Sequence, residues 1–567
     1  MCTSILFLSC RFSVGVGLGC DCCIGGMTEE APREVTPPPL QPIHAPSAKE
    51  RKYDRQLRLW AASGQRALEE SHVLLVVGNT SGSNTSVAGA ETLKNLILPS
   101  IGHFTIADSA KVTEADLGVN FFLEESSLGK SRADETTKFL QELNPDVQGH
   151  STSDPLDQWL PKQDSLKPYN LILVCAPLPP AELQTLSSYA LQQSIPLVYI
   201  KSQGFFSTAS IQLPPEFPIV DTHPDPETVQ DLRLLKPWAE LQEAEKELGD
   251  LAQMTDHDHG HVPWLLLLLR YLEHWKQQHG GQYPSDFKEK TEFRSFVRDQ
   301  ARTSNPEGGE ENFDEACAAV LKSISPPTLG SGCREMFNME SCTNLTQSSA
   351  NFWLIANAIK QFYDKHGVLP LPGALPDMKA TSAGYIKLQT IYKSKARADT
   401  AEVTHSVRKL ESSLGRAEQI AASEIEQFCK NASFVRVLTN HAKQPLPELR
   451  LQNGDAKSLA KLPAMLTNFQ SISEVFLAMN IDAIPSSALS ELKSLEDMIE
   501  GGTFEERIEK AIEEVRRTQG NEMHNTSSIT GGMVAQEAIK LLTRQYVPVD
   551  GVVIWDGIRS RTEVVKI

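Results

Sequence analysis

Short apolar runs alternate with amphipathic segments along the N-terminal part of the chain. Four runs of six or seven residues are apolar almost throughout, as is typical of strands buried on both faces of a sheet. These expected strands are residues 72–77, 103–108, 170–176 and 196–201. Residues 90–98, 131–143 and 181–193 lie between them and carry apolar side chains at helical spacing. The alternation predicts a parallel sheet of the Rossmann type, with helices packed on it.

A short helix is expected before the first strand. In KYDRQLRLW, the residues Tyr53, Leu57 and Trp60 are spaced at i, i+4 and i+7 and form one apolar face. Arg55 and Arg58 lie off that face. We therefore expect order to begin near Tyr53, with the two arginines directed away from the sheet.

The pattern becomes mostly helical after about residue 230 and returns to α/β character at the C-terminus. Long segments with a 3.6-residue period are 262–278, 349–366, 385–414 and 504–519. Near the C-terminus, GGMVAQEAIKLLTRQ predicts a helix opened by two glycines, and 552–556 and 560–567 predict strands. We expect one discontinuous α/β domain with a large helical insertion. The expected boundaries are a disordered tail at 1–50, the first part of the α/β domain at 51–225, the insertion at 226–515 and the returning part at 516–567.

Composition narrows the classes of partner. The chain has 567 residues, of which 40% are hydrophobic and 22% charged, and its formal net charge is −18. Because phosphate-rich partners require a basic surface, this charge argues against nucleic acids and anionic membranes. The longest apolar run, 262–269, is far shorter than the roughly 20 residues of a membrane span. We expect no nucleic acid and no membrane among the partners.

Cysteine placement indicates a reducing compartment. Five of the ten cysteines fall within the first 23 residues, and the other five form no C-x-x-C pair. We therefore expect a cytoplasmic and nuclear protein with reduced thiols. Residues 1–26 lack the basic start of a secretory signal. Since Met27 opens a more ordinary N-terminus, we expect 1–26 to be an extension of the gene model.

The turn after the first expected strand is the candidate nucleotide site. In a Rossmann-type fold, a glycine-rich turn at this point holds a phosphate. Here Gly78, Gly82 and Gly89 do not form G-x-G-x-x-G, so an ordinary connection is favoured over a phosphate cradle. Asp108 ends the second strand, where an acidic side chain can bind a ribose hydroxyl or simply terminate the strand.

Several segments taken together resemble the ubiquitin-activating enzyme superfamily. They are KYDRQLRLW, ETLKNLILPSIGHFTIAD, NFFLEESSLGKSRA and GGMVAQEAIKLL. Within the superfamily, the regulatory subunits of heterodimeric neddylation-activating enzymes are similar to HPDPETVQDLRLLKPWAEL, DHDHGHVPW and LPDMKATSAGYIKLQTIYKSKA. The resemblance covers most of residues 50–567 and is weakest at about 430–510. It implies a ThiF-type adenylation domain interrupted by a helical domain, which in catalytic members carries a cysteine.

The same resemblance implies a nucleotide site that has lost its chemistry. Active members carry Asp-x-Asp, then Asn-x-Asn-Arg-Gln, then Gly-x-x-Lys. The corresponding positions here hold Asp108 with Ala110, then Val119 for the arginine, then Arg132 for the lysine. The magnesium-binding aspartate is expected within 176–180, which has no carboxylate. Because adenylation needs magnesium and cations beside the phosphates, we expect a pseudo-adenylation domain that binds no cofactor and no metal.

The implied partner is a catalytic subunit that uses ATP and magnesium. The two subunits together would adenylate the C-terminal glycine of the ubiquitin-like modifier of neddylation, form a thioester and transfer the modifier to a conjugating enzyme. The resemblance also implies that Arg55 crosses the dimer interface toward the partner's ATP phosphates, with Arg58 as the second choice. No catalytic residue is expected in this chain.

The segment 377–399 has two open interpretations. Its spaced aromatic residues among charges are typical of an interface with the catalytic subunit. They are equally typical of an amphipathic helix packed inside the insertion. The interface residues expected on the first interpretation are Asp377, Tyr385, Leu388 and Tyr392.

The expected insertion contains cysteine and histidine residues that are candidates for reactive or metal-binding sites. Cys317, Cys333 and Cys342 lie in no loop resembling the thioester site, so buried structural thiols are expected. His257 and His261 flank a third histidine, His259, at alternate positions. On an extended segment the three would share a face and could bind zinc or copper. Their place just before an apolar helix favours a capped turn instead.

Two alternative functions remain for comparison. One is the regulatory subunit of a sumoylation-activating enzyme, which is shorter and lacks a large helical insertion. The other is an autonomous nucleotide-using enzyme, either a homodimeric adenylating enzyme or an NAD-dependent oxidoreductase. That class requires an intact phosphate loop and a metal carboxylate, and the sequence shows neither.

Overall fold

The computed structural model describes most of the chain. The described residues are 46–78, 87–161, 165–225, 231–303, 309–326, 328–416, 419–439, 446, 474–480 and 504–565. Two compact units are distinguished, Met1–Lys52 and Tyr53–Ile567. Helix α1 (Ala48–Lys52) belongs to the first unit, and every other element belongs to the second. Of the expected tail at 1–50, residues 46–50 are described and 48–50 belong to α1, whereas residues 1–26 lie outside the described residues.

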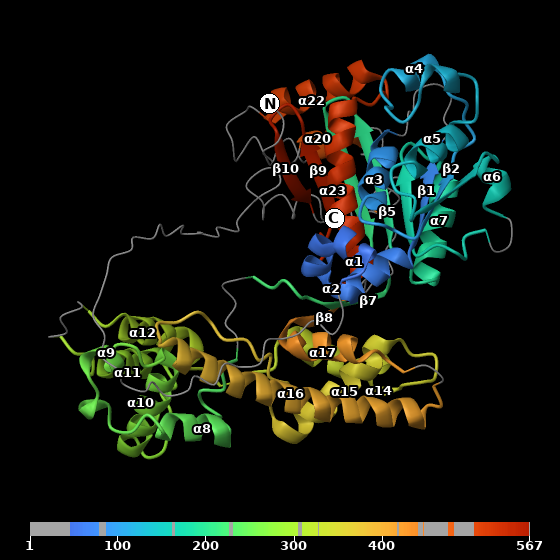
Figure 1. Cartoon of the computed structure of the whole chain (residues 1–567). Coiled ribbons are helices and arrows are strands. Elements are labelled where there is room, and N and C mark those ends of the chain that lie inside the picture. The colour runs from blue at the N-terminus through green and yellow to red at the C-terminus, as the bar shows by residue number, and fades with distance from the viewer. Residues whose placement is uncertain are drawn as a thin grey trace, which may run out of the picture. The chain divides into compact units, whose positions relative to one another are not determined.

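An eight-stranded sheet organises the α/β part of the second unit (Figure 1). Its order is β10–β9–β6–β5–β4–β1–β2–β3. The strands are β1 (His72–Val77), β2 (His103–Ala107), β3 (Gln148–Thr152), β4 (Leu171–Cys175), β5 (Leu197–Gln203), β6 (Phe206–Gln212), β9 (Val552–Asp556) and β10 (Arg561–Val565). Strands β1 to β5 pair in parallel, and β6, β9 and β10 add antiparallel pairs. The predicted Rossmann-like, mostly parallel sheet is confirmed.

Helices on both faces explain why the parallel strands are apolar throughout. In β1, Val73 and Leu75 pack into one hydrophobic cluster, and Leu74 and Val76 pack into another. Because side chains alternate across a strand, burial of both faces requires an apolar residue at every position. The helices of the α/β part are α2 (Asp54–Glu69), α3 (Val87–Ile97), α4 (Glu114–Leu117), α5 (Arg132–Gln141), α6 (Leu156–Trp159), α7 (Pro180–Gln192) and α23 (His524–Thr543).

Strands β3 and β6 were not predicted because neither is apolar. Strand β3 lies at the edge of the sheet, where QGHST remains mostly exposed. Strand β6 is buried although it reads FSTASIQ, because its hydroxyl and amide groups have partners. Thr530 Oγ1 donates to Ser207 Oγ at 2.6 Å, and Ser187 Oγ donates to Gln212 Oε1 at 2.5 Å. Side-chain hydrogen bonding therefore replaces apolar character in this strand.

Helix α23 begins earlier than the glycine pair suggested. It starts at His524, so Gly531 and Gly532 lie inside the helix and do not open it. Gly531 lies inside the helix because α23 packs closely against α3, which lies beside it (Figure 1). A Cβ atom at Gly531 would lie 2.6 Å from the Cβ atom of Glu91 on α3. Glycine at this position permits the two helices to approach each other.

The middle of the chain is helical, as predicted, and has two hydrophobic cores. Its helices are α8 (Ala239–Lys246), α9 (Asp256–His259), α10 (Trp264–Gln278), α11 (Phe287–Arg298), α12 (Glu311–Ser323), α13 (Ser331–Asn338), α14 (Glu340–Thr343), α15 (Asn351–His366), α16 (Ser382–Ser413) and α17 (Ala422–Lys430). Short 3₁₀ turns are Glu125–Ser127, Leu251–Gln253 and Ala432–Phe434. Helix α16 contributes Leu388 and Tyr392 to one core, and Val403 and Val407 to the other. A ribbon of β7 (Glu216–Val220) and β8 (Val435–Thr439) adjoins these helices in sequence.

Helices near the expected end of the insertion pack on the sheet. These are α20 (Glu474–Met479) and α22 (Phe504–Thr518), and Phe476 and Ile508 share a cluster with Val552 of β9. These contacts lie before the expected boundary at 515. We propose that the α/β part resumes by Glu474. None of the helices in the described ranges combines the length and apolar character that crossing a membrane requires.

Candidate functional site

The strand order changes direction between β1 and β4, and Rossmann-like sheets bind nucleotides at the carboxyl ends of strands beside such a point. Gly78 follows β1 here, and Pro177 lies just after β4. A Cβ atom at Gly78 would lie 1.7 Å from the carbonyl oxygen of Pro177. The two backbones are therefore in contact at the point where the strand order changes direction, and this contact narrows the space between the ends of β1 and β4. Gly82 of the candidate turn lies outside the described residues.

A buried ion-pair cluster occupies the position predicted for ribose and metal binding. Arg132 binds Asp108 in a bidentate manner, with Nε 2.6 Å from Oδ2 and Nη2 3.2 Å from Oδ1. Its Nη1 also donates to Asp116 Oδ1 at 2.8 Å. The three side chains are at most 5% exposed. Burial opposes the charge on Arg132, but the two carboxylates outweigh burial and raise the pKa of Arg132.

Nearby backbone and hydroxyl groups satisfy the remaining carboxylate oxygens. The amide of Ala110 donates to Asp108 Oδ1 at 2.9 Å. The amide and hydroxyl of Thr113 donate to Asp116 Oδ2 at 2.7 and 2.6 Å. All four carboxylate oxygens thus accept hydrogen bonds from within the chain. A ribose hydroxyl or a magnesium ion would have to displace these bonds, so the residues present do not fit the nucleotide or its metal.

The four residues predicted for the degenerate site are placed differently. Asp108 and Arg132 are joined directly, and Ala110 takes part through its amide. Val119 lies after α4 with a half-buried side chain, and its carbonyl accepts a hydrogen bond from His524 Nδ1 at 3.0 Å. Asp116, the partner that completes the cluster, was not among the predicted site residues.

Glu522 is a site residue that the sequence did not reveal. Its Oε2 accepts hydrogen bonds from the amide of Ala88, at the start of α3, and from Ser527 Oγ, at 2.9 and 2.6 Å. The residue is 6% exposed. Ala88 and Glu522 are separated by 434 positions, so no local pattern connects them. An acidic residue just before the returning helix is the sole signal in the sequence.

The N-terminal helix α2 presents Arg55 to solvent. Tyr53 and Trp60 are buried, Leu57 is half-buried, and Arg55 is exposed, so the predicted apolar face is confirmed. Arg58 pairs with Asp54 on the same helix, with Nη2 3.1 Å from Oδ2. Within the described ranges, Arg55 forms no salt bridge. The backbone kinks after Trp60, where Ala61 has a φ of 54°.

The expected interface residues of α16 divide between core and surface. Tyr392 is 0% exposed and its hydroxyl donates to the carbonyl of Leu232 at 2.6 Å. Leu388 is 1% exposed in the same core. These two residues therefore support the helix from inside and do not offer surface to a partner, which corrects the prediction for them. Asp377 is exposed and Tyr385 is half-buried.

The candidate cysteines are buried thiols. Cys317, Cys333 and Cys342 are each at most 2% exposed. Burial raises the pKa of Cys317, and it raises the pKa of Cys333 and of Cys342 to about 11. Cys333 Sγ donates to the carbonyl of Ala432 at 3.2 Å. A nucleophilic cysteine needs an accessible thiolate, so these residues have the properties of structural thiols.

The three alternate histidines do not converge. His257 and His259 lie in α9, a single helical turn capped by the side chain of Thr255, and His261 follows it, so the segment is not extended. His259 is buried with Nδ1 2.8 Å from Glu310 Oε1, whereas the exposed ring of His257 stacks on the half-buried ring of His261. Among the residues that the structure describes, no group of three or more histidine, cysteine or acidic side chains is arranged to hold a metal ion.

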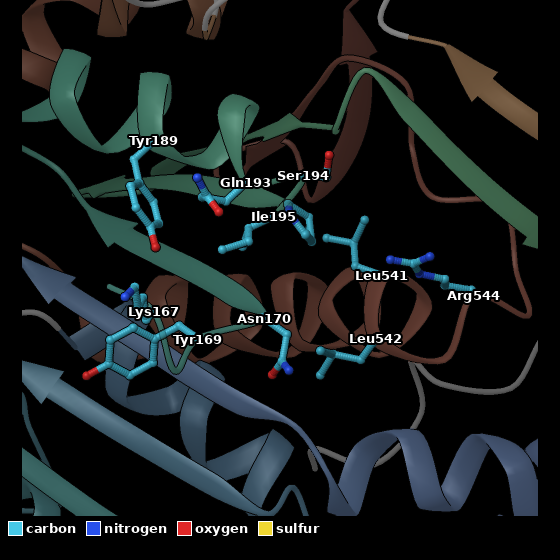
Figure 2. A pocket seen from close by; sticks show the side chains of 11 residues that line it. Lys167, Tyr169, Asn170, Tyr189, Gln193, Ser194, Ile195, Leu541, Leu542 and Arg544 are labelled. Carbon is cyan, nitrogen blue, oxygen red and sulfur yellow. The ribbon is translucent and has the colours of Figure 1, made fainter. Parts of the chain in front are cut away.

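A separate pocket opens at the opposite end of the strands (Figure 2). It has a volume of about 350 Å³ and lies between the residues preceding β4 and β5 and the end of α23. Tyr169 and Asn170 line it beside Leu542 and Arg544. Because Rossmann-like sheets bind nucleotides at the carboxyl ends of their strands, this pocket is not the nucleotide position.

Comparison of the sequence with known proteins identifies relatives and a family for this chain. The chain is 36% identical over 534 residues to the NEDD8-activating enzyme E1 regulatory subunit of Xenopus laevis, covering 90% of this chain and 97% of that protein. It is 30% identical over 537 residues to the NEDD8-activating enzyme E1 regulatory subunit AXR1 of Arabidopsis thaliana, covering 91% and 96%. The model described as the ThiF family matches residues 53–567. The chain belongs to the ThiF family.

Proposed function

We propose that this chain is the regulatory subunit of a heterodimeric NEDD8-activating enzyme. The observation that carries the proposal is the similarity to proteins of that name along nearly their whole length. The chain spans 97% of the Xenopus laevis relative, so the helical middle is included as well as the sheet. The names of these relatives favour this function over the sumoylation alternative.

The buried ion-pair cluster supports a non-catalytic role. Arg132 forms ion pairs with both Asp108, the residue predicted at the ribose position, and Asp116. Adenylation needs a metal ion and cations directed at the phosphates. The catalytic subunit would therefore bind ATP and magnesium and carry the reactive cysteine. It would adenylate the modifier's C-terminal glycine, form the thioester and pass the modifier to a conjugating enzyme.

Arg55 is the residue through which this chain would act on the partner's ATP. It is exposed on α2, whose buried face fixes the helix against the rest of the unit. A guanidinium held on a rigid helix can enter a neighbouring site and stabilise phosphate charge. Arg58 is the weaker candidate because Asp54 already neutralises it.

The surface around Asp377 and Tyr385 is our proposed contact with the catalytic subunit. Both residues keep accessible side chains, and Ile386, which follows Tyr385 on α16, is 54% exposed. Exposed apolar and aromatic side chains on one helix have the composition of an interface anchor. The buried Leu388 and Tyr392 hold this part of α16 in place. We place the complex in the cytoplasm and the nucleus, with no nucleic acid or membrane partner.

ATP–pyrophosphate exchange tests the proposed function. The isolated chain should show no exchange with or without the modifier. Addition of the catalytic subunit should restore exchange that depends on the modifier and on magnesium. Exchange by the isolated chain would favour an autonomous adenylating enzyme and overturn the proposal. Affinity purification should yield a catalytic subunit of the same enzyme at one-to-one stoichiometry.

A further inference from the structure

The N-terminus of α3 is the place where a Rossmann-like fold holds a phosphate. Amides at the start of the helix after the first strand point at the anion, and the helix dipole favours negative charge there. In this chain the Ala88 amide donates instead to Glu522 Oε2, at 2.9 Å. Ser527 Oγ donates to the same oxygen at 2.6 Å. A carboxylate of the chain itself thus lies at the anion position.

The carboxylate is held in a closed environment. Glu522 is 6% exposed and lies directly before α23, which packs along α3. A Cβ atom at Gly89, in the first turn of α3, would lie 2.6 Å from Cys175 Sγ. The start of α3 therefore abuts the end of β4 on one side and the segment carrying Glu522 on the other. Within the described residues, the Glu522 carboxyl group and the end of β4 therefore both lie against the start of α3.

The charge at this position is also wrong for a nucleotide. Burial raises the pKa of Glu522, whereas the Ser527 hydroxyl, the Ala88 amide and Arg132 act to lower it. Arg132 is already shared between Asp108 and Asp116. Asp108 and Asp116 pair directly with Arg132, and Glu522 lies within its electrostatic influence, so this region has more carboxyl groups than guanidinium groups. An added triphosphate would meet excess negative charge in a site that water does not screen.

We infer that the carboxyl group of Glu522 seals the phosphate position of this fold. The carboxylate replaces a phosphate at the start of α3, while Arg132 replaces the ribose and metal contacts of Asp108. The sealing residue also ties the segment before α23 to the first turn of α3. This inference depends on the fold and not on the proposed function, so it holds or fails independently of the pathway.

Phosphate binding by a Glu522→Ala variant tests the seal. The full-length variant and the wild-type chain would be unfolded thermally while inorganic phosphate or pyrophosphate is raised at constant ionic strength. Removal of the carboxylate leaves amides without an anion, so either anion should raise the Tm of the variant saturably, by about 3 °C. The wild-type Tm should not respond. A folded Glu522→Ala variant that does not respond either would overturn the inference.

Glu537→Ala is the matched control. Glu537 is a buried glutamate on α23, and its Oε2 accepts a hydrogen bond from the amide of Val549 at 2.9 Å, away from any helix start. Its replacement removes a comparable buried carboxylate without opening the anion position. The control variant should unfold at a lower temperature and show no response to phosphate. An equal response in both variants would show that the effect is not specific to Glu522.

Hydrogen exchange decides the question if Glu522→Ala does not fold. Glu522→Met keeps the length of the side chain without a charge or an acceptor, and such replacements of buried ionic groups are often tolerated. Exchange in the peptide Val87–Glu91 should become at least tenfold faster in Glu522→Met. Glu522→Gln keeps an acceptor oxygen and should remain near the wild-type rate. Unchanged exchange in Glu522→Met would show that the carboxylate does not hold α3, and the inference would fall.

Discussion

Arg132 and Arg55 show how the surroundings of one residue type set its role. Arg132 is 5% exposed and forms ion pairs with two carboxylates, so its charge is used inside the fold. Arg55 is exposed on a helix whose opposite face is buried, so its charge remains available to another molecule. A buried ion pair of this kind fixes local geometry and gives little net stability, because desolvation offsets the attraction. The two arginines carry the same charge, so their different roles follow from their burial and their partners.

Replacement of Arg55 by alanine tests the proposed contact with the partner's ATP. A trans-acting cation of this type is typically worth about 2–4 kcal/mol in the transition state. Arg55→Ala should leave folding and dimerisation unchanged and slow pyrophosphate exchange by the heterodimer at least tenfold. Arg58→Ala is the control and should have less effect, because Asp54 already pairs with Arg58. Exchange at the wild-type rate in Arg55→Ala dimers would limit this chain to a scaffolding role.

Restoration of single residues should not revive the nucleotide site. Val119→Arg and Ala110→Asp each return one group that active members of the superfamily carry. Neither change removes Arg132 from Asp108 or Glu522 from α3, so the nucleotide position stays filled. We expect no ATP–pyrophosphate exchange from either variant of the isolated chain. Measurable turnover from one of them would mean that the site is less damaged than the geometry indicates.

At the scale of elements, three neighbouring parallel strands bring three histidines together near their N-terminal ends. His72 of β1 lies beside His103 of β2 and His150 of β3, with ring centroids 5.2 and 5.6 Å away. Its Nε2 is 2.8 Å from Thr105 Oγ1. Burial, with His103 and His150 as further causes, lowers the pKa of His72 to about 4. The parallel register creates the cluster, because His72 pairs with His103 at one level.

The lowered pKa predicts a loss of stability in mild acid. The unfolded chain binds a proton at His72 near pH 6.5, whereas the folded chain binds it near pH 4. The contribution is therefore complete above pH 6.5 and is lost as the pH falls toward 4. Because the ring is only partly buried, we expect about 1–2 kcal/mol after allowance for solvent screening. Denaturant titrations at several pH values would measure it.

The variant His72→Phe separates this histidine from the other titrating groups. Its free energy of unfolding should fall less steeply between pH 6.5 and pH 4 than that of the wild-type chain. His405→Phe replaces an exposed histidine on α16 and should keep the wild-type slope. A wild-type slope in His72→Phe would contradict the assignment.

At the scale of the whole molecule, the sheet is completed by segments from both ends of the chain. Strand β9 pairs with β6, and α23 packs along α3, although more than 300 residues separate each pair. The two cores of the helical part draw mainly on residues between β7 and β8. The helical part therefore has its own hydrophobic interior, whereas the α/β part depends on its C-terminal segment.

Truncation tests this dependence. A fragment of residues 53–225 lacks α23, β9 and β10 and should aggregate, because its sheet edge and the apolar side of α3 are uncovered. Co-expression with residues 474–567 should recover a folded complex. A fragment of residues 231–434 should unfold cooperatively by itself. Circular dichroism and thermal unfolding would show these differences, and a stable, monomeric 53–225 fragment would contradict the argument.

The sequence alone was sufficient for the elements whose local pattern is set by burial. Strands β1, β2, β4 and β5 are apolar at nearly every position because both faces of the sheet are covered. The amphipathic helices could be predicted for the same reason, because burial of one side of a helix requires apolar residues on that side. The resemblance to active members of the superfamily also indicated that Ala110 and Val119 stand where those members carry a carboxylate and a guanidinium.

Only the tertiary structure decided how the side chains of the site are used. In the folded chain, Arg132 is buried and pairs with two carboxylates. Glu522 accepts a hydrogen bond from the first turn of α3, a helix that begins 435 positions earlier at Val87. The tertiary structure also directed Leu388 and Tyr392 into a core. Each of these outcomes depends on which distant segment packs against the residue. Local spacing fixes the face of a helix or strand on which a side chain lies, but the free energy of a buried charge depends on partners that the chain supplies from far away.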